Sequence, residues 1–313
     1  MKIGAFIPQG WRMDLNDLKP LDQWGKIVQC AKNIEDLGFH SLWVYDHFHT
    51  VPSPTIQPTY ECWTLMSALS QTTKKIRLGQ MCTCNSYRNP SYLTKVASNI
   101  DVISNGRLEF AIGAGWYDQE YEAYGYDYPT DKNRLEMLEE AVLIYIEMTT
   151  KEKSSFKGKF YEIKEAINEP KPIQKPYPPL WICGGGEKVT LKLLAKYGDY
   201  GNWDVDHEGF EHKTKILKKH CLDVDRDFNE ITRTLHTNVI IGEDKKDLQN
   251  KINKISKDTS IPESYFISRP LVGTKEDVFE SLDKFKDLGC EYLIAYIADI
   301  TWGNTLEILK ERL

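Results

Sequence analysis

The chain has 313 residues and a formal net charge of −6. A chain of this length buries a sizeable core without disulfide or metal support, and α/β barrels of more than about 250 residues are often single domains. The acidic balance, with charges of both signs interspersed, argues against nucleic acid and anionic membranes as main partners.

Seven cysteines are scattered along the chain. Their odd number and irregular spacing predict free thiols in a reducing compartment. The sequence contains no CxxC pair and no histidine cluster, so we expect no metal site. The chain starts with MKIGAFIPQG, which turns polar too early for a secretory signal peptide, and no apolar run reaches membrane-spanning length. We therefore expect a cytoplasmic protein.

Short apolar and β-branched runs recur along the chain and predict strands. They cover residues 2–8, 41–46, 76–82, 108–112, 180–183, 200–203, 231–241 and 291–297. Helical periodicity between them predicts helices over residues 21–37, 61–72, 93–100, 187–197, 206–220 and 243–256, and two more capped by Asp131 and Thr274. Eight strands alternating with helices favour one (β/α)8 TIM-barrel domain over residues 1–313. A doubly wound open sheet, usually of fewer strands, is the alternative.

Three segments do not fit the simple alternation. Residues 116–129 are aromatic, acidic and too rich in glycine and proline for one helix, and residues 155–163 suggest a hairpin. Residues 257–272 show no regular pattern. We therefore expect a barrel with an insertion after strand 4 and an irregular segment before the last barrel helix.

The stretch 76–116 reads as a strand, a helix and a second strand, which makes two parallel neighbours. In the second strand, the large residues 108, 110 and 112 alternate with Glu109, Ala111 and Gly113. The small side chains suit the crowded interior of a closed barrel, and the large ones suit the face that packs on helices. We interpret Glu109 as a paired, buried group near the barrel axis rather than a catalytic one.

Polar residues at predicted strand ends are the first candidates for chemistry. Asp46 and His47 follow the second strand directly, and a carboxylate beside an imidazole can exchange a proton near neutral pH. The alternative is a structural pair that fixes the next loop. Arg88 follows the polar segment after the third strand. Its fork can bind an anionic ligand or pair with a neighbouring carboxylate.

Two glycine-lined turns are the second group of candidates. Gly184, Gly185 and Gly186 stand between a predicted strand and a helix, where backbone amides can approach a phosphate. The spacing matches neither GxGxxG nor a P-loop. Gly113 and Gly115 form a similar opening after the fourth strand. Together the turns favour a flat or phosphorylated ligand, and one or two of the tryptophans at strand ends are expected to line its pocket.

Four linked stretches resemble the bacterial luciferase-like superfamily, and more closely its coenzyme F420-dependent oxidoreductase branch. They include LGFHSLWVYDHF at 37–48, the whole of 76–125, PPLWICGGGEKVTLKLLAKYGDYGNW at 178–203, and 269–294. The resemblance implies a hydride transfer between coenzyme F420 and a small organic substrate, in a homodimer. The alternatives are an FMN-dependent monooxygenase that uses oxygen and a separate reductase, and a flavin-holding protein without turnover.

The resemblance also implies roles for individual residues. His47 and Asp46 look like the family's catalytic pair beside the reactive ring, and the Met81–Cys82 bond, or the next one, falls where the family has a non-prolyl cis peptide. The residues matching the cofactor site are Asp46, Met81, Cys82, Thr83, Arg88, Gly113, Gly115, Trp116, Gly184, Gly185 and Gly186.

One position departs from the family pattern. The family's sugar-phosphate dehydrogenases carry a glutamate directly after the strand-4 glycine pair, where this chain has Trp116. The departure argues against sugar-phosphate oxidation and removes one acid/base candidate. Glu120 and Glu122 are near that position in the sequence but do not occupy it.

Overall fold

Eight parallel strands close into a barrel in the computed structural model, which describes residues 1–16 and 18–313. Neighbouring strands pair in the cyclic order β1, β2, β3, β5, β8, β9, β10 and β12, and β12 pairs back to β1. The strands are β1 (Lys2–Phe6), β2 (Ser41–Val44), β3 (Arg77–Gln80), β5 (Leu108–Gly113), β8 (Leu180–Cys183), β9 (Tyr200–Trp203), β10 (Thr232–Gly242) and β12 (Tyr292–Ile297). The predicted barrel is confirmed, and the open-sheet alternative is wrong.

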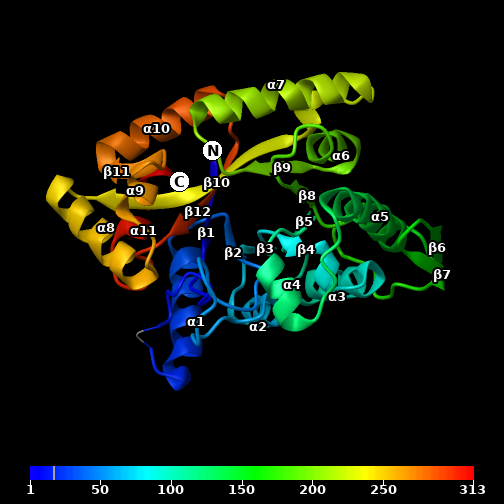
Figure 1. Cartoon of the computed structure of the whole chain (residues 1–313), viewed down its shortest axis with the longest axis horizontal. Helices are drawn as coiled ribbons and strands as arrows, with labels where there is room; N and C mark the ends of the chain where they lie inside the picture. Colours follow the sequence, from blue (N-terminus) through cyan, green and yellow to red (C-terminus); the bar gives the residue numbers. More distant parts are fainter. Residues whose placement is uncertain (17) are drawn as a thin grey trace.

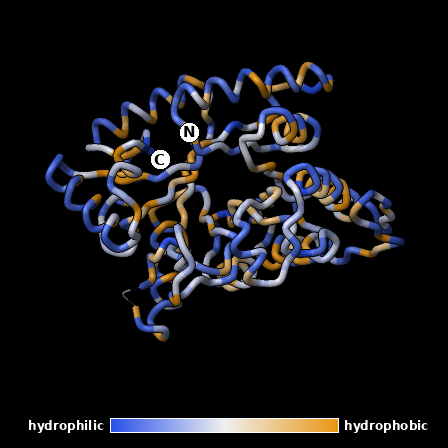
Figure 2. The backbone as a smooth tube through the Cα atoms, in the orientation of Figure 1, coloured by the Kyte–Doolittle hydropathy of each residue, from blue (hydrophilic) through white to orange (hydrophobic). Residues whose placement is uncertain are grey.

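Helices surround the barrel strands (Figure 1). They are α1 (Pro20–Asp36), α2 (Cys62–Thr72), α3 (Pro90–Ile103), α5 (Asp131–Thr150), α6 (Thr190–Tyr197), α7 (His207–Asp223), α8 (Lys245–Thr259) and α10 (Lys275–Asp287). Along these helices, hydrophobic and hydrophilic residues alternate (Figure 2), as expected where one face packs on the strands. Thr274 caps α10 as predicted, whereas the cap of α5 is Thr130, one residue before the expected Asp131.

The barrel interior is filled by aromatic side chains between small residues. Trp43 and Trp181 are fully buried and meet edge to face, with ring centroids 4.8 Å apart. A side chain at Gly79 would collide with Trp43, because a Cβ there would lie 2.3 Å from the indole. Glu109 is buried and paired with Arg77, and it accepts a hydrogen bond from Nε1 of Trp181 at 2.7 Å. The structural interpretation of Glu109 is confirmed.

The insertion after the fourth barrel strand contains the short helix α4 (Asp118–Tyr124), which ends at Gly125 in the left-handed conformation, and the hairpin of β6 (Ser154–Lys157) and β7 (Glu162–Ala166). The hairpin lies at the edge of the molecule beyond α5 (Figure 1). The short strand β4 (Thr83–Cys84) pairs with β5.

The expected irregular segment 257–272 is the main error in the predicted fold. It contains the end of α8, helix α9 (Glu263–Ile267) and the start of strand β11 (Leu271–Thr274). β11 pairs with the second half of β10, which continues beyond the part that pairs with β9. A five-residue helix and a four-residue strand are too short to show a period in the sequence. Helix α11 (Thr305–Leu309) and a short 3-10 helix (Lys310–Arg312) follow β12.

Within residues 1–16 and 18–313, no helix combines the length and the hydrophobicity that crossing a membrane requires.

Candidate active site

A cavity of about 540 Å³ opens at the carboxyl ends of the barrel strands. This size is in the range of cofactor and substrate pockets. It brings together most of the predicted site residues, namely Asp46, His47, Met81, Cys82, Gly113, Gly115, Trp116, Gly184 and Gly185. Thr83, Arg88 and Gly186 do not line it. Residues that the sequence did not single out, among them Arg12, Tyr45, Thr190 and His236, complete the wall.

Asp46 and Arg88 form a buried ion pair at the edge of this cavity. Arg88 donates through Nη1 to Oδ2 of Asp46 at 2.7 Å and through Nη2 to Oδ1 at 2.9 Å. The amide of Cys84 donates to the same Oδ2 at 2.8 Å, and Arg88 also donates to Glu61 at 2.7 Å. The Asp46 carboxylate therefore ties the end of β2 to the segment after β3. These contacts favour a positioning role for both residues over catalysis by Asp46 and cofactor binding by Arg88.

The same corner holds the carboxylates of Asp46 and Glu61 and the thiol of Cys62, whose ligand atoms lie within 4.8 Å of one another. Such a group can bind a metal ion, but here the guanidinium of Arg88 donates to both carboxylates. Arg88 therefore neutralises the two carboxylates in the way that a bound metal ion would.

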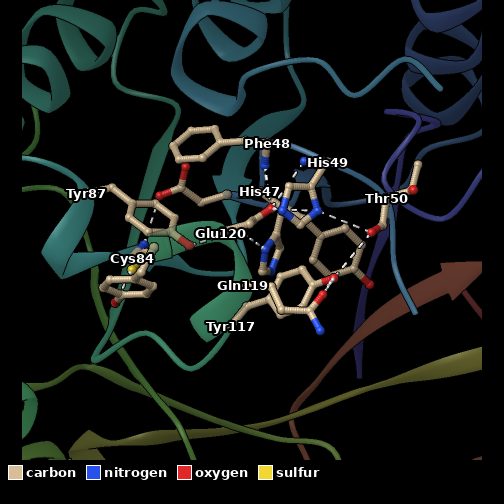
Figure 3. A network of polar contacts seen from close by, with 12 residues as sticks. His47, Phe48, His49, Thr50, Cys84, Tyr87, Tyr117, Gln119 and Glu120 are labelled. Carbon is tan, nitrogen blue, oxygen red and sulfur yellow. Dashed lines mark hydrogen bonds and ion pairs between the residues drawn. The ribbon is translucent and has the colours of Figure 1, made fainter. Parts of the chain in front are cut away.

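His47 is held by Glu120, the residue that sequence reasoning set aside (Figure 3). Nδ1 of His47 lies 2.8 Å from Oε2 of Glu120, which also accepts from the hydroxyl of Tyr87 at 2.8 Å. Oε1 accepts from the amides of Phe48 at 2.7 Å and His49 at 3.2 Å. The Glu120 side chain is completely buried.

The protonation of this pair follows from the contacts. Burial raises the pKa of Glu120, but hydrogen bonds from His47, the Phe48 amide and Tyr87 outweigh burial and lower that pKa below its ordinary value. Glu120 is therefore an ionised acceptor at neutral pH, and Nδ1 of His47 carries a proton. No described residue hydrogen-bonds to Nε2 of His47, so this nitrogen is available to a ligand in the cavity.

Aromatic rings fix the plane of the imidazole. His47 stacks on Trp11 with ring centroids 4.3 Å apart and an interplanar angle of 1°. The rings of Trp116 and Tyr117 approach it edge-on, each at 5.8 Å. With its ring packed between aromatic neighbours and its Nδ1 bound, His47 presents one nitrogen in one orientation, which is the arrangement a general acid or base needs.

Sulfur atoms and glycines form another wall. The Met81–Cys82 peptide bond is cis, as the family resemblance implied. The Cys183 thiol lies 3.4 Å from the sulfur of Met81. A Cβ at Gly113 would lie 2.6 Å from the sulfur of Cys82, so Gly113 is required by the close approach of this thiol. Gly115 has a φ of +80°, a conformation that glycine adopts without strain.

The triglycine turn forms a third wall. Gly184 and Gly185 face the cavity, whereas Gly186 packs against Thr190, the first residue of α6. The helix therefore starts three residues later than the predicted Glu187. Nζ of Lys213, from α7, donates to the carbonyl of Gly185 at 2.8 Å and to Glu187 at 2.6 Å. The turn thus combines exposed backbone, a threonine hydroxyl and a nearby cation, a set that suits a phosphate.

Tyr45 and His236 lie at a further part of the cavity wall. The Tyr45 hydroxyl lies 3.1 Å from Nε2 of His236. Burial lowers the pKa of His236 to about 4, so its imidazole is neutral at physiological pH. In the sequence, His236 is a single histidine within a long predicted strand, and nothing marks it as a residue of the cavity wall.

A family model described as luciferase-like monooxygenase matches residues 1–261. The chain belongs to this family. The resemblance to the luciferase-like superfamily, noted from the sequence, is thereby confirmed.

Among relatives in this luciferase-like family, an F420-dependent glucose-6-phosphate dehydrogenase of Amycolatopsis mediterranei is 28% identical over 193 residues, which are 61% of this chain and 55% of the relative. The pyrimidine monooxygenase RutA of Serratia proteamaculans is 31% identical over 219 residues, 64% of this chain and 56% of the relative. The chain thus spans about half the length of the curated relatives it matches.

Solved structures share the fold over the whole chain. An F420-dependent secondary alcohol dehydrogenase in complex with an F420–acetone adduct aligns with a TM-score of 0.82 at 20% identity, covering 100% of this chain and 98% of that one. The monooxygenase RslO1 of Streptomyces bottropensis aligns with a TM-score of 0.83 at 17% identity and the same coverage. At these identities the likeness establishes the luciferase-like barrel.

Proposed function

We propose that this protein is an oxidoreductase that transfers a hydride between coenzyme F420 and a small organic substrate. The observation that carries the proposal is the His47–Glu120 pair, in which a buried carboxylate fixes one tautomer of an imidazole that faces the cavity. Family membership and the F420-dependent relative support the same function.

The cavity walls fit a flat ring with a phosphate-bearing tail. Met81, Cys82 and Gly113 form a smooth surface of sulfur and backbone that would hold the ring. Gly184, Gly185, Thr190 and Lys213 would hold the phosphate, through backbone amides, a hydroxyl and an ammonium group.

The chain and the cofactor have separate tasks in this scheme. Coenzyme F420, whose ring is a deazaflavin, would supply the hydride chemistry when bound, because no side chain can perform it. Trp11, Trp116 and Tyr117 shield the reacting centre from water on the side of His47. His47 exchanges a proton with the substrate at Nε2, and Glu120 stabilises the imidazolium form that arises when His47 accepts that proton.

A second candidate function uses the same cavity. The pyrimidine monooxygenase relative favours an FMN-dependent monooxygenase that takes oxygen and a separate reductase. FMN also carries a flat ring and a phosphate, so the walls described above fit it as well. A protein that only stores a flavin has no evident use for the buried Glu120 behind His47.

Titration of the purified protein with F420 and with FMN, followed by ligand fluorescence, tests the proposal. Tight binding of F420 with weak binding of FMN supports it, and the next step is a screen for substrates that reduce or reoxidise bound F420. The reverse preference, with substrate-dependent oxygen uptake, supports the monooxygenase. Binding of neither compound refutes both. The homodimer implied by the family resemblance is tested separately by light scattering on the eluting protein.

A further inference from the structure

Arg12 lines this cavity and differs from the other arginines of the chain in its hydrogen-bond partners. It lies in the segment after β1 and lines the wall, and its Nε is buried without a hydrogen-bond partner. Within residues 1–16 and 18–313, no carboxylate pairs with it. Every other arginine of the chain donates to carboxylates or carbonyl oxygens, namely Arg77, Arg88, Arg107, Arg134, Arg226, Arg233, Arg269 and Arg312.

Aromatic rings are the surroundings of the Arg12 guanidinium. Its central carbon lies 4.8 Å from the ring centroid of Trp11, 5.1 Å from that of Tyr296 and 5.9 Å from that of Tyr45. Such contacts stabilise a cation only in part, and they do not replace a counter-ion.

A partly buried arginine cannot shed its charge. The partly buried carboxylate of Asp14 is close enough to interact with this charge, but its Oδ1 accepts from the amides of Gln9 and Gly10. The hydroxyl of Tyr265 also interacts with the guanidinium, and within the described residues Arg12 makes no ion pair.

The position of Arg12 indicates which ligand supplies the missing anion. Arg12 and His47 line the same cavity and contact the same indole, that of Trp11, so a single ring connects Arg12 to the proposed proton-transfer residue. Gly185 and Thr190, which the proposed function assigns to the phosphate, follow β8 at a different part of the wall, and Lys213 reaches Gly185 from α7. The counter-ion of Arg12 therefore belongs to the substrate rather than to the cofactor tail.

We propose that the substrate carries a carboxylate that Arg12 binds through its planar fork. A guanidinium matches a carboxylate in charge and in bidentate geometry. The faces of Trp11 and Tyr45 suit a flat or apolar body next to that carboxylate. This inference rests on the proposed function in taking the cavity as the catalytic one, and it narrows the substrate class to small organic acids.

Matched acid and amide probes test the inference by binding alone. Benzoate and benzamide, and hexanoate and hexanamide, are titrated up to about 10 mM by calorimetry, into the protein without cofactor and into the protein saturated with F420 or FMN. We expect at least one acid to bind about tenfold tighter than its amide, because only the acid forms a charge-assisted pair. Arg12→Met should abolish this preference, and Arg12→Lys should retain part of it.

A control variant separates Arg12 from general positive charge. Lys26 lines a neighbouring cavity of about 230 Å³ that Arg12 also borders, but it does not line the main cavity. Lys26→Met should leave the acid preference unchanged. Arg12→Met should also unfold no more easily than the parent protein in urea, because it removes a partly buried charge that makes no ion pair within the described residues.

Several results would overturn the inference. They are the absence of acid binding to the parent protein, an acid preference that survives in Arg12→Met, and a marked loss of stability in that variant, which would reveal a structural partner. Weakened F420 or FMN binding in Arg12→Met would assign the residue to the cofactor instead. Failure of the parent protein to bind either cofactor refutes the proposed function, while the titration without cofactor still decides the role of Arg12.

Discussion

Replacing Glu120 by glutamine alters the site at one atom, the Oε2 that His47 and Tyr87 both contact. The amides of Phe48 and His49 can only donate, so the carbonyl of the introduced glutamine must face them. The new NH₂ group then points at His47 and Tyr87. The tyrosine hydroxyl can rotate to accept, but His47 must offer the lone pair of Nδ1 and move its proton to Nε2.

The consequence for turnover follows from this change of tautomer. Nε2, the nitrogen that faces the cavity, loses the lone pair that accepts a proton, and the carboxylate that stabilises the imidazolium is gone. We expect turnover to fall by about 10²- to 10⁴-fold. The lower figure is typical of the loss of a general acid or base, and the higher one of an imidazole held in the wrong tautomer. The loss of charge-assisted hydrogen bonds should lower the free energy of unfolding by about 1–3 kcal/mol.

Ring ¹⁵N shifts of His47 are the assay that distinguishes this mechanism from general damage. The parent protein should show the proton on Nδ1, and Glu120→Gln should show it on Nε2. Tyr87→Phe is the matched control, since it removes one hydrogen bond from the same oxygen without forcing a new tautomer. We expect less than about a tenfold loss of turnover there. Parent-like turnover in Glu120→Gln, or an equal loss in Tyr87→Phe, would refute the reasoning.

Glu120→Gln should also change how the free energy of unfolding depends on pH in the acid range. The pKa of Glu120 is depressed in the folded protein from an ordinary value of 4.5, so its ionised form stabilises the fold above about that pH. This contribution is lost as the pH falls through the lower, folded pKa. Glu120→Gln should lack it, and urea unfolding at pH 7 and at about pH 4 should differ less in the variant than in the parent.

Further substitutions test the remaining parts of the site. His47→Ala should keep the fold and most cofactor affinity but slow turnover by about 10²-fold or more, measured with saturating cofactor. Gly185→Asp should weaken binding of both phosphate-bearing cofactors in the fluorescence titration, through repulsion and crowding. Gly115→Ala should lower the melting temperature, because its Cβ would lie 2.0 Å from the hydroxyl of Tyr121 at a φ of +80°. The partly buried His236 has a pKa lowered from 6.5 to about 4, so its neutral form stabilises the fold above about pH 6.5, and this contribution is lost as the pH falls to about 4. His236→Gln should flatten that part of the curve of unfolding free energy against pH.

The barrel was predictable because its strands are buried on both faces. Such strands appear in the sequence as short apolar runs, for example 180–183 and 291–297, and each ends at a polar or glycine-rich turn. Alternation of small and large residues in 108–112 even gave the correct inward face. Segment 257–272 was missed because α9 and β11 depend on tertiary contacts, the latter on pairing with the extension of β10.

Most of the predicted site residues line one cavity, whereas Thr83, Arg88 and Gly186 do not. Loops after parallel strands meet at one end of a barrel, and this rule alone located His47 and the glycine turns. The direction of a side chain in such a loop has no sequence signal, so the rule did not show that Arg88 turns toward Asp46 or that Thr83 lies buried away from the cavity. Lys213 was missed for a related reason, because it is one of several lysines on the charged helix α7.

Trp116 stands where the sugar-phosphate dehydrogenases of the family have a glutamate, and Glu120 lies nearby. The positions of these two residues bear on the kind of substrate that this site can use. The carboxylate that related sugar-phosphate dehydrogenases are expected to place after the glycine pair is absent, and the exposed indole of Trp116 stands beside His47 in its place. Glu120, in the first turn of α4, lies completely buried behind the imidazole and can act on a substrate only through His47. The wall near His47 therefore offers aromatic faces and the cation of Arg12, while the exposed carboxylate of Asp204, which lines the same cavity, is paired with Arg269. We infer that such a wall suits a flat organic acid, and the acid and amide titrations of the parent protein and of Arg12→Met test how much the cation contributes to binding such an acid.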